Sequence, residues 1–146
     1  MAVRSLLALV LALPIAACVS FAPTFDATIY DRLSAANSSL AKLETAIETK
    51  APGKLRYSDA EGYYIDALAE IGEAQDVADR RPAYLSGQPS AEAARLSAAN
   101  IKSCREAIEF SRTTFKESGQ AVRTLDDLST VRNTCAIPKT MEGMLK

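Results

Sequence analysis

The stretch CREAIEFSRTTFKESGQAVRTLDDLSTVRNTC, residues 104–135, decides how this chain folds. Apolar residues recur in it every three or four positions, both before and after Ser118-Gly119, and this spacing predicts α-helix. Periodicity alone leaves two interpretations open: one long helix that continues to Asn133, or two helices that reverse direction at Gly119. In one continuous helix, Cys104 and Cys135 would lie about 46 Å apart, because each residue adds roughly 1.5 Å.

Three segments upstream have the same helical pattern: Thr24–Lys50, Ser58–Arg80, and a segment that begins at Ser90 and enters the stretch above. Each carries one apolar stripe, which is typical of a helix that packs against other helices. In chain order the stripes are Ile29, Leu33, Ala36, Leu40, Leu43 and Ile47; Tyr64, Leu68, Ile71, Ala74 and Ala78, widened by Ile65 and Val77; and Ala94, Ala98, Ile101, Cys104, Ile108 and Phe115.

The ends of these helices carry recognisable signals. Thr24 can cap the first helix, and Ser58-Asp59-Ala60-Glu61 has the form of a capping box at the start of the second. Pro82 is expected to stop the second helix, and Arg80-Arg81 just before it complements the negative end of the helix dipole.

The N-terminus has the composition of a secretory signal. A charged start at Arg4 is followed by the apolar run Leu6–Leu13, which is well short of the roughly 20 residues that span a bilayer. The next residues, Ile15-Ala16-Ala17-Cys18, resemble the lipobox of bacterial lipoproteins. The resemblance implies a signal peptide at residues 1–17, lipid on Cys18 and a lipid-anchored tether at 18–23. The alternative is an ordinary cleaved signal with a cysteine near the cut.

The resemblance also accounts for the three cysteines. If lipid occupies Cys18, then Cys104 and Cys135 remain, and an oxidising periplasm favours a disulfide between them over two buried free thiols. A disulfide requires Cα atoms within about 7 Å, which a continuous helix cannot provide. The chain is therefore expected to reverse at Gly119, with a third helix ending near Glu117 and a fourth at Gln120–Asn133.

These expectations combine into an all-α fold. We predict an up-down antiparallel helical bundle over residues 24–135, with three long helices, a short fourth helix and one disulfide. Residues 136–146 are predicted to be a flexible tail. Its Met141, Met144 and Leu145 are free to dock on the bundle or to contact a partner.

Composition excludes several classes of function. The chain without its signal has a net charge of about −2, which gives no basic footprint for nucleic acid. It holds no histidine, so histidine-ligated metals and nucleophile–histidine pairs are absent, and no glycine-rich phosphate loop occurs. We therefore expect no cofactor, no metal site and no catalytic residue.

The remaining polar candidates are weak. Carboxylate pairs at Glu70 with Glu73 and at Asp126-Asp127 are interpreted as solvated helix faces, not as the acids of a cell-wall hydrolase. The basic row Lys102, Arg105, Arg112 and Lys116 is interleaved with Glu106 and Glu109, which favours pairing within the helix over an acidic partner. Tyr63 and Tyr84 are candidate partner contacts, against the alternative of packing under the loop at 82–89.

The sequence thus favours a non-enzymatic interaction or structural subunit of the bacterial envelope, anchored by lipid on Cys18. Val19 follows the cysteine, whereas in well-studied lipoproteins Asp at this position retains the protein at the inner membrane. The resemblance therefore implies the outer membrane, with the bundle facing the periplasm and a protein partner there. A pilotin-like escort of a secretion channel is the alternative, on the basis of size, anchor and helical content. A carboxylate-based cell-wall enzyme is the alternative from another class.

Overall fold

The computed structural model describes residues 22–50, 54–119 and 121–146, and in these ranges every regular element is a helix. The helices are α2 (Ala27–Thr49), α3 (Tyr57–Tyr84), α4 (Ser90–Ser118) and α5 (Ala121–Gly143). The predicted all-α class is therefore confirmed. The predicted signal peptide at 1–17, the lipidation site Cys18 and the tether up to residue 21 lie outside the described residues.

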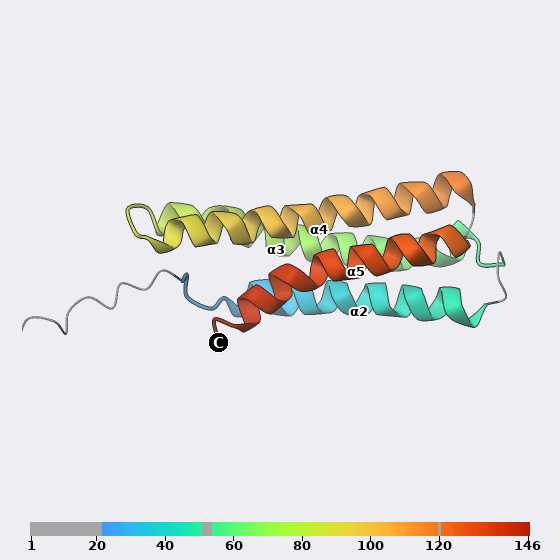
Figure 1. Cartoon of the computed structure of the whole chain (residues 1–146), viewed down its shortest axis with the longest axis horizontal. Coiled ribbons are helices and arrows are strands. Elements are labelled where there is room, and N and C mark those ends of the chain that lie inside the picture. Colours follow the sequence, from blue (N-terminus) through green and yellow to red (C-terminus); the bar gives the residue numbers. More distant parts are fainter. Residues whose placement is uncertain (1–21, 51–53, 120) are drawn as a thin grey trace, which may run out of the picture.

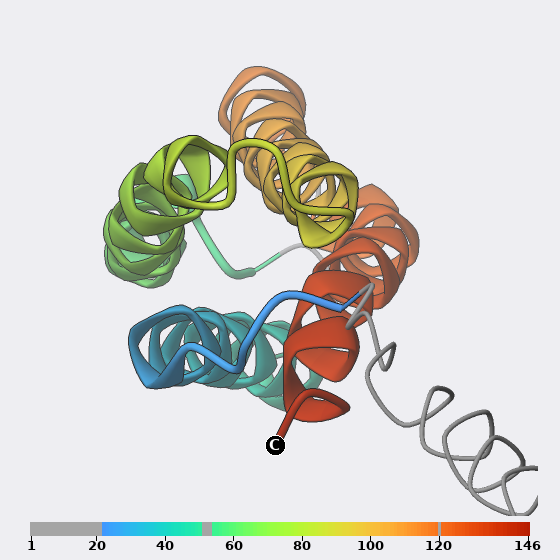
Figure 2. The ribbon, with the colours of Figure 1, turned by 90° about the vertical axis from the view of Figure 1, so that its left-hand side faces the viewer.

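The four helices form a closed ring around one core. α2 packs against α3, α3 against α4, α4 against α5, and α5 closes the ring by packing against α2. Consecutive helices run in opposite directions along the long axis (Figure 1), and the view along that axis shows the four helices around a shared interior (Figure 2).

The apolar stripes predicted from the sequence face this interior. Every member of the α2 stripe is at most 5 % exposed, and the α4 stripe is likewise buried. The α3 stripe is narrower than predicted, because Ile65 is 50 % exposed and the core side is instead completed by Ala60 and Ala67. Small alanines on this face allow α3 to approach its neighbours closely.

Three predicted helix ends differ in the structure. Asp26, not Thr24, caps α2: its carboxylate accepts hydrogen bonds from the backbone N–H groups of Thr28 (2.9 Å) and Ile29 (3.1 Å). The capping box at Ser58 does not form, because α3 already begins at Tyr57. α3 also continues through Pro82 to Tyr84, since a proline so near the helix end removes one backbone hydrogen bond without ending the helix at once.

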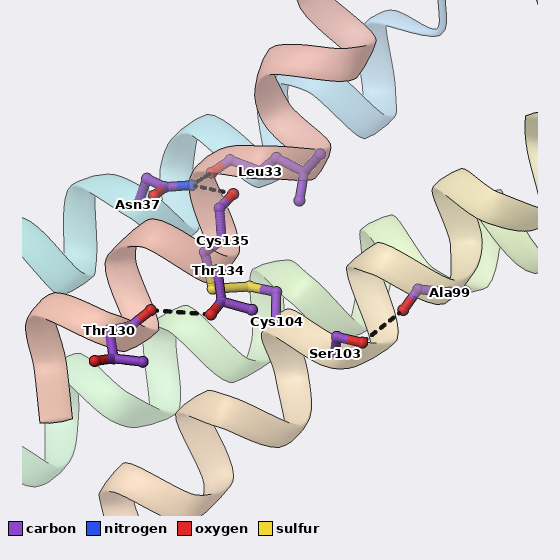
Figure 3. Close-up of a disulfide and its surroundings, with 8 residues drawn as sticks. All are labelled: Leu33, Asn37, Ala99, Ser103, Cys104, Thr130, Thr134 and Cys135. Atoms are coloured by element: carbon purple, nitrogen blue, oxygen red, sulfur yellow. Dashed lines mark hydrogen bonds between the residues drawn. A yellow bond between two sulfur atoms is a disulfide. The ribbon is translucent and has the colours of Figure 1, made fainter.

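The reversal at Gly119 is present. Gly119 has φ 63°, in the left-handed region that suits glycine, and its N–H donates to the carbonyl of Phe115 at 3.0 Å to close α4. Cys104 on α4 and Cys135 on α5 form a disulfide, with Cα atoms 4.7 Å apart. Beside it, the amide of Asn37 on α2 donates to the carbonyls of Leu33 (2.8 Å) and Cys135 (3.3 Å), so α2 is bonded to α5 at the same level (Figure 3).

The C-terminal segment corrects two predictions. The fourth helix is not short, since α5 has 23 residues like α2, and residues 136–143 are helical and not a flexible tail. The buried side of α5 explains the difference, because it continues at spacings of 3, 4, 3 and 4 past the predicted end: Leu128, Val131, Cys135, Pro138 and Glu142. The pattern is hard to recognise from the sequence because its last two buried positions are a proline and a glutamate, which are not typical core residues of a helix.

One hydroxyl pair crosses the core between α3 and α4. Tyr64 and Ser111, both 0 % exposed, share a hydrogen bond of 3.0 Å between their side-chain oxygens. Burial of the phenol raises the pKa of Tyr64 to about 12, despite the opposing effect of the bond to Ser111. This tyrosine should therefore resist ionisation as long as the bundle is folded.

The disulfide closes a loop with a sequence separation of 31. In the chain-entropy model such a link stabilises the fold by about 3–4 kcal/mol. We expect the double variant Cys104→Ser/Cys135→Ser to unfold at lower urea concentration, with its free energy of unfolding reduced by about that amount. Unchanged stability, or two free thiols in a peptide map made without reductant, would contradict this assignment.

The buried phenol gives a prediction for alkaline pH. Because the pKa of Tyr64 is higher in the folded state than the roughly 10 of an unfolded tyrosine, its contribution to stability is complete below pH 10 and is lost as the pH rises toward 12. Near-ultraviolet titration should show one of the five tyrosines ionising late. Tyr64→Phe should remove that late phase and Tyr63→Phe should keep it; ionisation of all five together near pH 10 would refute the prediction.

Candidate functional site

The two carboxylate pairs singled out in the sequence have different surroundings in the structure. Glu70 and Glu73 on α3 both pair with the guanidinium of Arg32 on α2, at 2.9 and 2.8 Å. Asp126 is exposed and Asp127 half-buried on α5. Across residues 22–50, 54–119 and 121–146, no three acidic or cysteine side chains gather as a metal site would require.

Three residues of the basic row on α4 pair with side chains of the same chain. Lys102 and Arg105 pair one helical turn onward, with Glu106 (3.8 Å) and Glu109 (3.1 Å), as expected. Arg112 departs from the prediction because it reaches across to α3.

Arg112 joins a small polar cluster with two residues of α3. It donates to the hydroxyl of Tyr57 (2.8 Å) and to the carboxylate of Glu61 (3.1 Å). Hydrogen bonds from Tyr57 and Arg112 hold the pKa of Glu61 below its ordinary value. The cluster ties α3 to α4 and leaves Arg112 engaged with groups of its own chain.

The two predicted contact tyrosines are not brought together. Tyr63 is half-buried and lies beside a shallow groove on α2 that includes Lys42 and Thr45. Tyr84 is the last residue of α3 and is 77 % exposed. Because 21 residues of helix separate them, they stand about 30 Å apart and cannot belong to one small contact surface.

Tyr84 belongs instead to a region where three chain segments meet, which we call the 22–26 end. The first described residues, Ala22–Asp26, lie at the same end of the bundle as the α3–α4 loop and the end of α5 (Figure 1). Two large apolar side chains there are mostly exposed, Tyr84 at 77 % and Met144 at 80 %. Nearby, the Lys146 ammonium lies over the rings of Phe25 (5.4 Å) and Tyr30 (4.7 Å).

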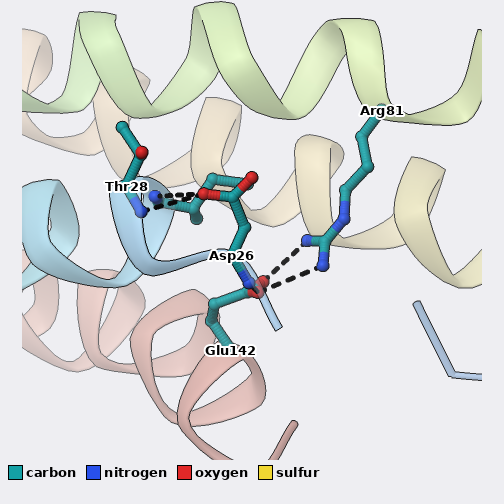
Figure 4. A network of polar contacts seen from close by, with 5 residues as sticks. Asp26, Thr28, Arg81 and Glu142 are labelled. Carbon is teal, nitrogen blue, oxygen red and sulfur yellow. Dashed lines mark hydrogen bonds and ion pairs between the residues drawn. The ribbon is translucent and has the colours of Figure 1, made fainter. Parts of the chain in front are cut away.

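A buried ion pair holds the three segments of the 22–26 end together. Glu142 on α5 is 0 % exposed, and both its oxygens accept from the guanidinium of Arg81 on α3, at 2.9 and 3.2 Å. The same carboxylate accepts the backbone N–H of Asp26 at 2.6 Å, just before α2 (Figure 4). A bidentate pair of this kind neutralises the buried carboxylate and also fixes the relative orientation of the two side chains.

Sequence reasoning missed this pair. In the sequence, the dipole of its own helix is enough to explain Arg81, and Glu142 falls in the segment 136–146 that is predicted to be a flexible tail. One feature of the sequence could have indicated that Glu142 is buried. Cys135, Pro138 and Glu142 follow one another at spacings of 3 and 4, which continue the buried side of α5.

An apolar pocket of about 300 Å³ lies beside the ion pair. It is enclosed by Ala22 and Pro23, by the first turns of α4, and by the end of α5 with Met141 and Leu145. The hydroxyl oxygen of Ser97 is buried beside it and has no hydrogen-bond partner among the described residues. The pocket suits a single apolar group and is too small for a helix.

A larger groove of about 710 Å³ runs between α2 and α5. Polar and apolar surface share its walls: Ser34, Asn37, Arg132 and Lys139 lie among Tyr30, Ala136 and Met144, and Arg132 is itself paired with Glu44. The charged side chains Arg132 and Lys139 in these walls suit the groove to a partner that brings polar groups, and less to a wholly apolar helix face.

Searches with family models, among curated proteins and among solved structures found no match for this chain. Among the described residues, no helix combines the length and the apolar character that a membrane crossing requires. The proposals below therefore rest on the chain's own sequence and geometry.

The buried ion pair predicts a large effect of one substitution. Arg81→Met leaves the carboxylate of Glu142 buried without its cation, which should lower the free energy of unfolding by about 3–5 kcal/mol in urea denaturation. The matched control is Arg95→Met, because Arg95 pairs with Glu92 at an exposed position (61 % and 81 %) and should cost less than about 1 kcal/mol.

A second variant separates charge from packing. Adding Glu142→Gln to Arg81→Met removes the buried charge but keeps an oxygen that can accept from Asp26, so part of the lost stability should return. If Arg81→Met costs no more than Arg95→Met, the ion pair does not hold this end of the bundle.

Proposed function

We propose that this chain is a lipid-anchored protein of the bacterial envelope whose helical bundle acts as a non-enzymatic interaction subunit. The observation that carries the proposal is the segment Ile15-Ala16-Ala17-Cys18, which resembles a lipobox and stands only four residues before the first described residue. A tether from Cys18 to Ala22 spans at most about 14 Å. A lipid on Cys18 would hold the bundle directly at the membrane surface, stably if two or more acyl chains are attached.

The disulfide supports an extracytoplasmic location. Disulfides persist in oxidising compartments such as the periplasm and are rare in the cytosol. Cys104 and Cys135 pair with each other inside the bundle, and the third cysteine of the sequence, Cys18, lies outside the described residues. Lipidation gives this third cysteine a role, and Val19 after it favours the outer membrane.

The distribution of charge supports binding over catalysis. The acidic side chains in the predicted pairs at Glu70 and Glu73, and the buried Glu142, are each held by an arginine. A general acid or base needs a carboxylate that can exchange protons with a substrate, and these are engaged in structural pairs. An up-down bundle with such pairs is suited to present a surface to another protein.

The pilotin-like alternative requires a groove that accepts an amphipathic helix. The α2–α5 groove has the charged side chains Arg132 and Lys139 in its partly apolar walls, and the apolar pocket at the 22–26 end is too small for a helix. These features favour a general envelope subunit over a pilotin-like escort.

The anchor is tested by feeding cells an alkyne-tagged fatty acid during expression of the full chain. We expect label on the wild-type protein and its recovery with membranes. Cys18→Ala should lose the label, whereas Cys104→Ser/Cys135→Ser should keep it, because the anchor does not need the disulfide. A wild-type chain that is secreted and unlabelled would refute the proposal.

A further inference from the structure

The 22–26 end has a composition that differs from the rest of the surface. From Pro82 to Ala91 the chain carries no charged residue, and this run forms the end of α3 and the loop to α4. Tyr84 stands in it with 77 % of its surface exposed, and Gly87 turns the chain with φ 80°. Met144, 80 % exposed, directly follows α5, which ends at Gly143. Large exposed apolar side chains on an uncharged tip favour contact with an apolar or interfacial phase.

Both acidic and basic side chains lie next to the uncharged run at residues 82–91. Two acidic groups of the 22–26 end are engaged in the fold, since Glu142 is buried against Arg81 and Asp26 caps α2. Two more remain at the surface: Asp79 near the end of α3, which accepts from Gln75, and Glu92 in the first turn of α4, which pairs with Arg95. Two cations, Arg80 and Lys146, are exposed there. Each exposed cation near the bilayer is attracted to anionic headgroups by about 1 kcal/mol, and the exposed carboxylates Asp79 and Glu92 oppose this attraction, so the apolar side chains carry the contact.

Chain length sets the distance between this end and a membrane. Cys18 is four residues from Ala22, so an anchored chain keeps Ala22, the first described residue of the 22–26 end, within about 14 Å of the acylated cysteine. The interfacial layer of a bilayer is roughly 5–8 Å thick on each side. Side chains at this end are therefore within reach of the headgroups, whereas the opposite end of the 29-residue α4 lies about 40 Å away.

We propose that the 22–26 end docks on the phospholipid headgroup layer, with Tyr84 and Met144 entering the interface, so that the bundle stands upright on the membrane. This inference rests on the proposed lipid anchor at Cys18. Tyrosine suits the position because its ring is apolar and its hydroxyl can remain hydrated. The upright orientation leaves the far end and the sides of the bundle available to a periplasmic partner.

The chain contains no tryptophan, so a single introduced tryptophan is a clean probe. The full lipidated chain is reconstituted into phosphatidylcholine–phosphatidylglycerol vesicles, with or without bromine on the acyl chains. The test variant is Tyr84→Trp. The matched control is Phe110→Trp, because Phe110 is also an exposed aromatic (67 %) but lies 20 residues into α4, about 30 Å along the helix. Circular dichroism establishes that both variants keep the helical content of the wild type.

We expect the emission of Tyr84→Trp to shift to the blue on membrane binding and to be quenched by brominated lipid, while Phe110→Trp shows neither change. Quenching of Phe110→Trp to the same degree would mean that the bundle lies on its side, and it would overturn the upright orientation. If neither probe is quenched although the protein floats with the vesicles, docking is refuted and the anchor stands. A chain isolated without acyl groups on Cys18 overturns both proposals.

Discussion

The covalent link between Cys104 and Cys135 fixes the register of α4 against α5, and much of the structure depends on that register. Glu142 follows Cys135 by seven residues, two helical turns or about 10 Å, which brings its carboxylate to the level of Arg81. Beside it, the amide of Asn100 on α4 lies 3.3 Å from the sulfur of Met141. With the start of α2 bonded to the same carboxylate, three distant parts of the chain meet at one end.

The sequence predicted the parts of the fold in which each residue type is the usual one for its position, such as an apolar residue in the core or a glycine at a helix end. The α2 stripe of Ile29 to Ile47 is apolar at every core position, so periodicity alone identified its buried face. The reversal at Gly119 followed from the cysteine assignment, since a helix through that residue would keep the cysteines too far apart. In the first case the burial of apolar side chains determines which face of the helix is inside, and in the second the length of a disulfide determines that the chain must reverse.

Prediction failed where a residue had an uncommon role. Pro138 usually marks a helix end and Glu142 usually faces water, yet both occupy buried positions of α5. Glu142 can be buried only because Arg81 neutralises it, and that partner lies 61 residues away in the sequence. Local patterns carry no information about such a partner. The same reason explains Arg112, whose bonds to Tyr57 and Glu61 on α3 required the tertiary structure.

We propose that the three cysteines have two tasks: Cys18 would anchor the chain to the membrane, whereas the disulfide between Cys104 and Cys135 holds α5 on the bundle. The most direct test is mass spectrometry of peptides from the full chain, extracted from membranes without reductant. The account predicts an N-terminal peptide that begins at Cys18 and carries acyl groups, and a second species in which Cys104 and Cys135 are linked. An unacylated Cys18, or Cys18 in a disulfide with either of the other two, would contradict it.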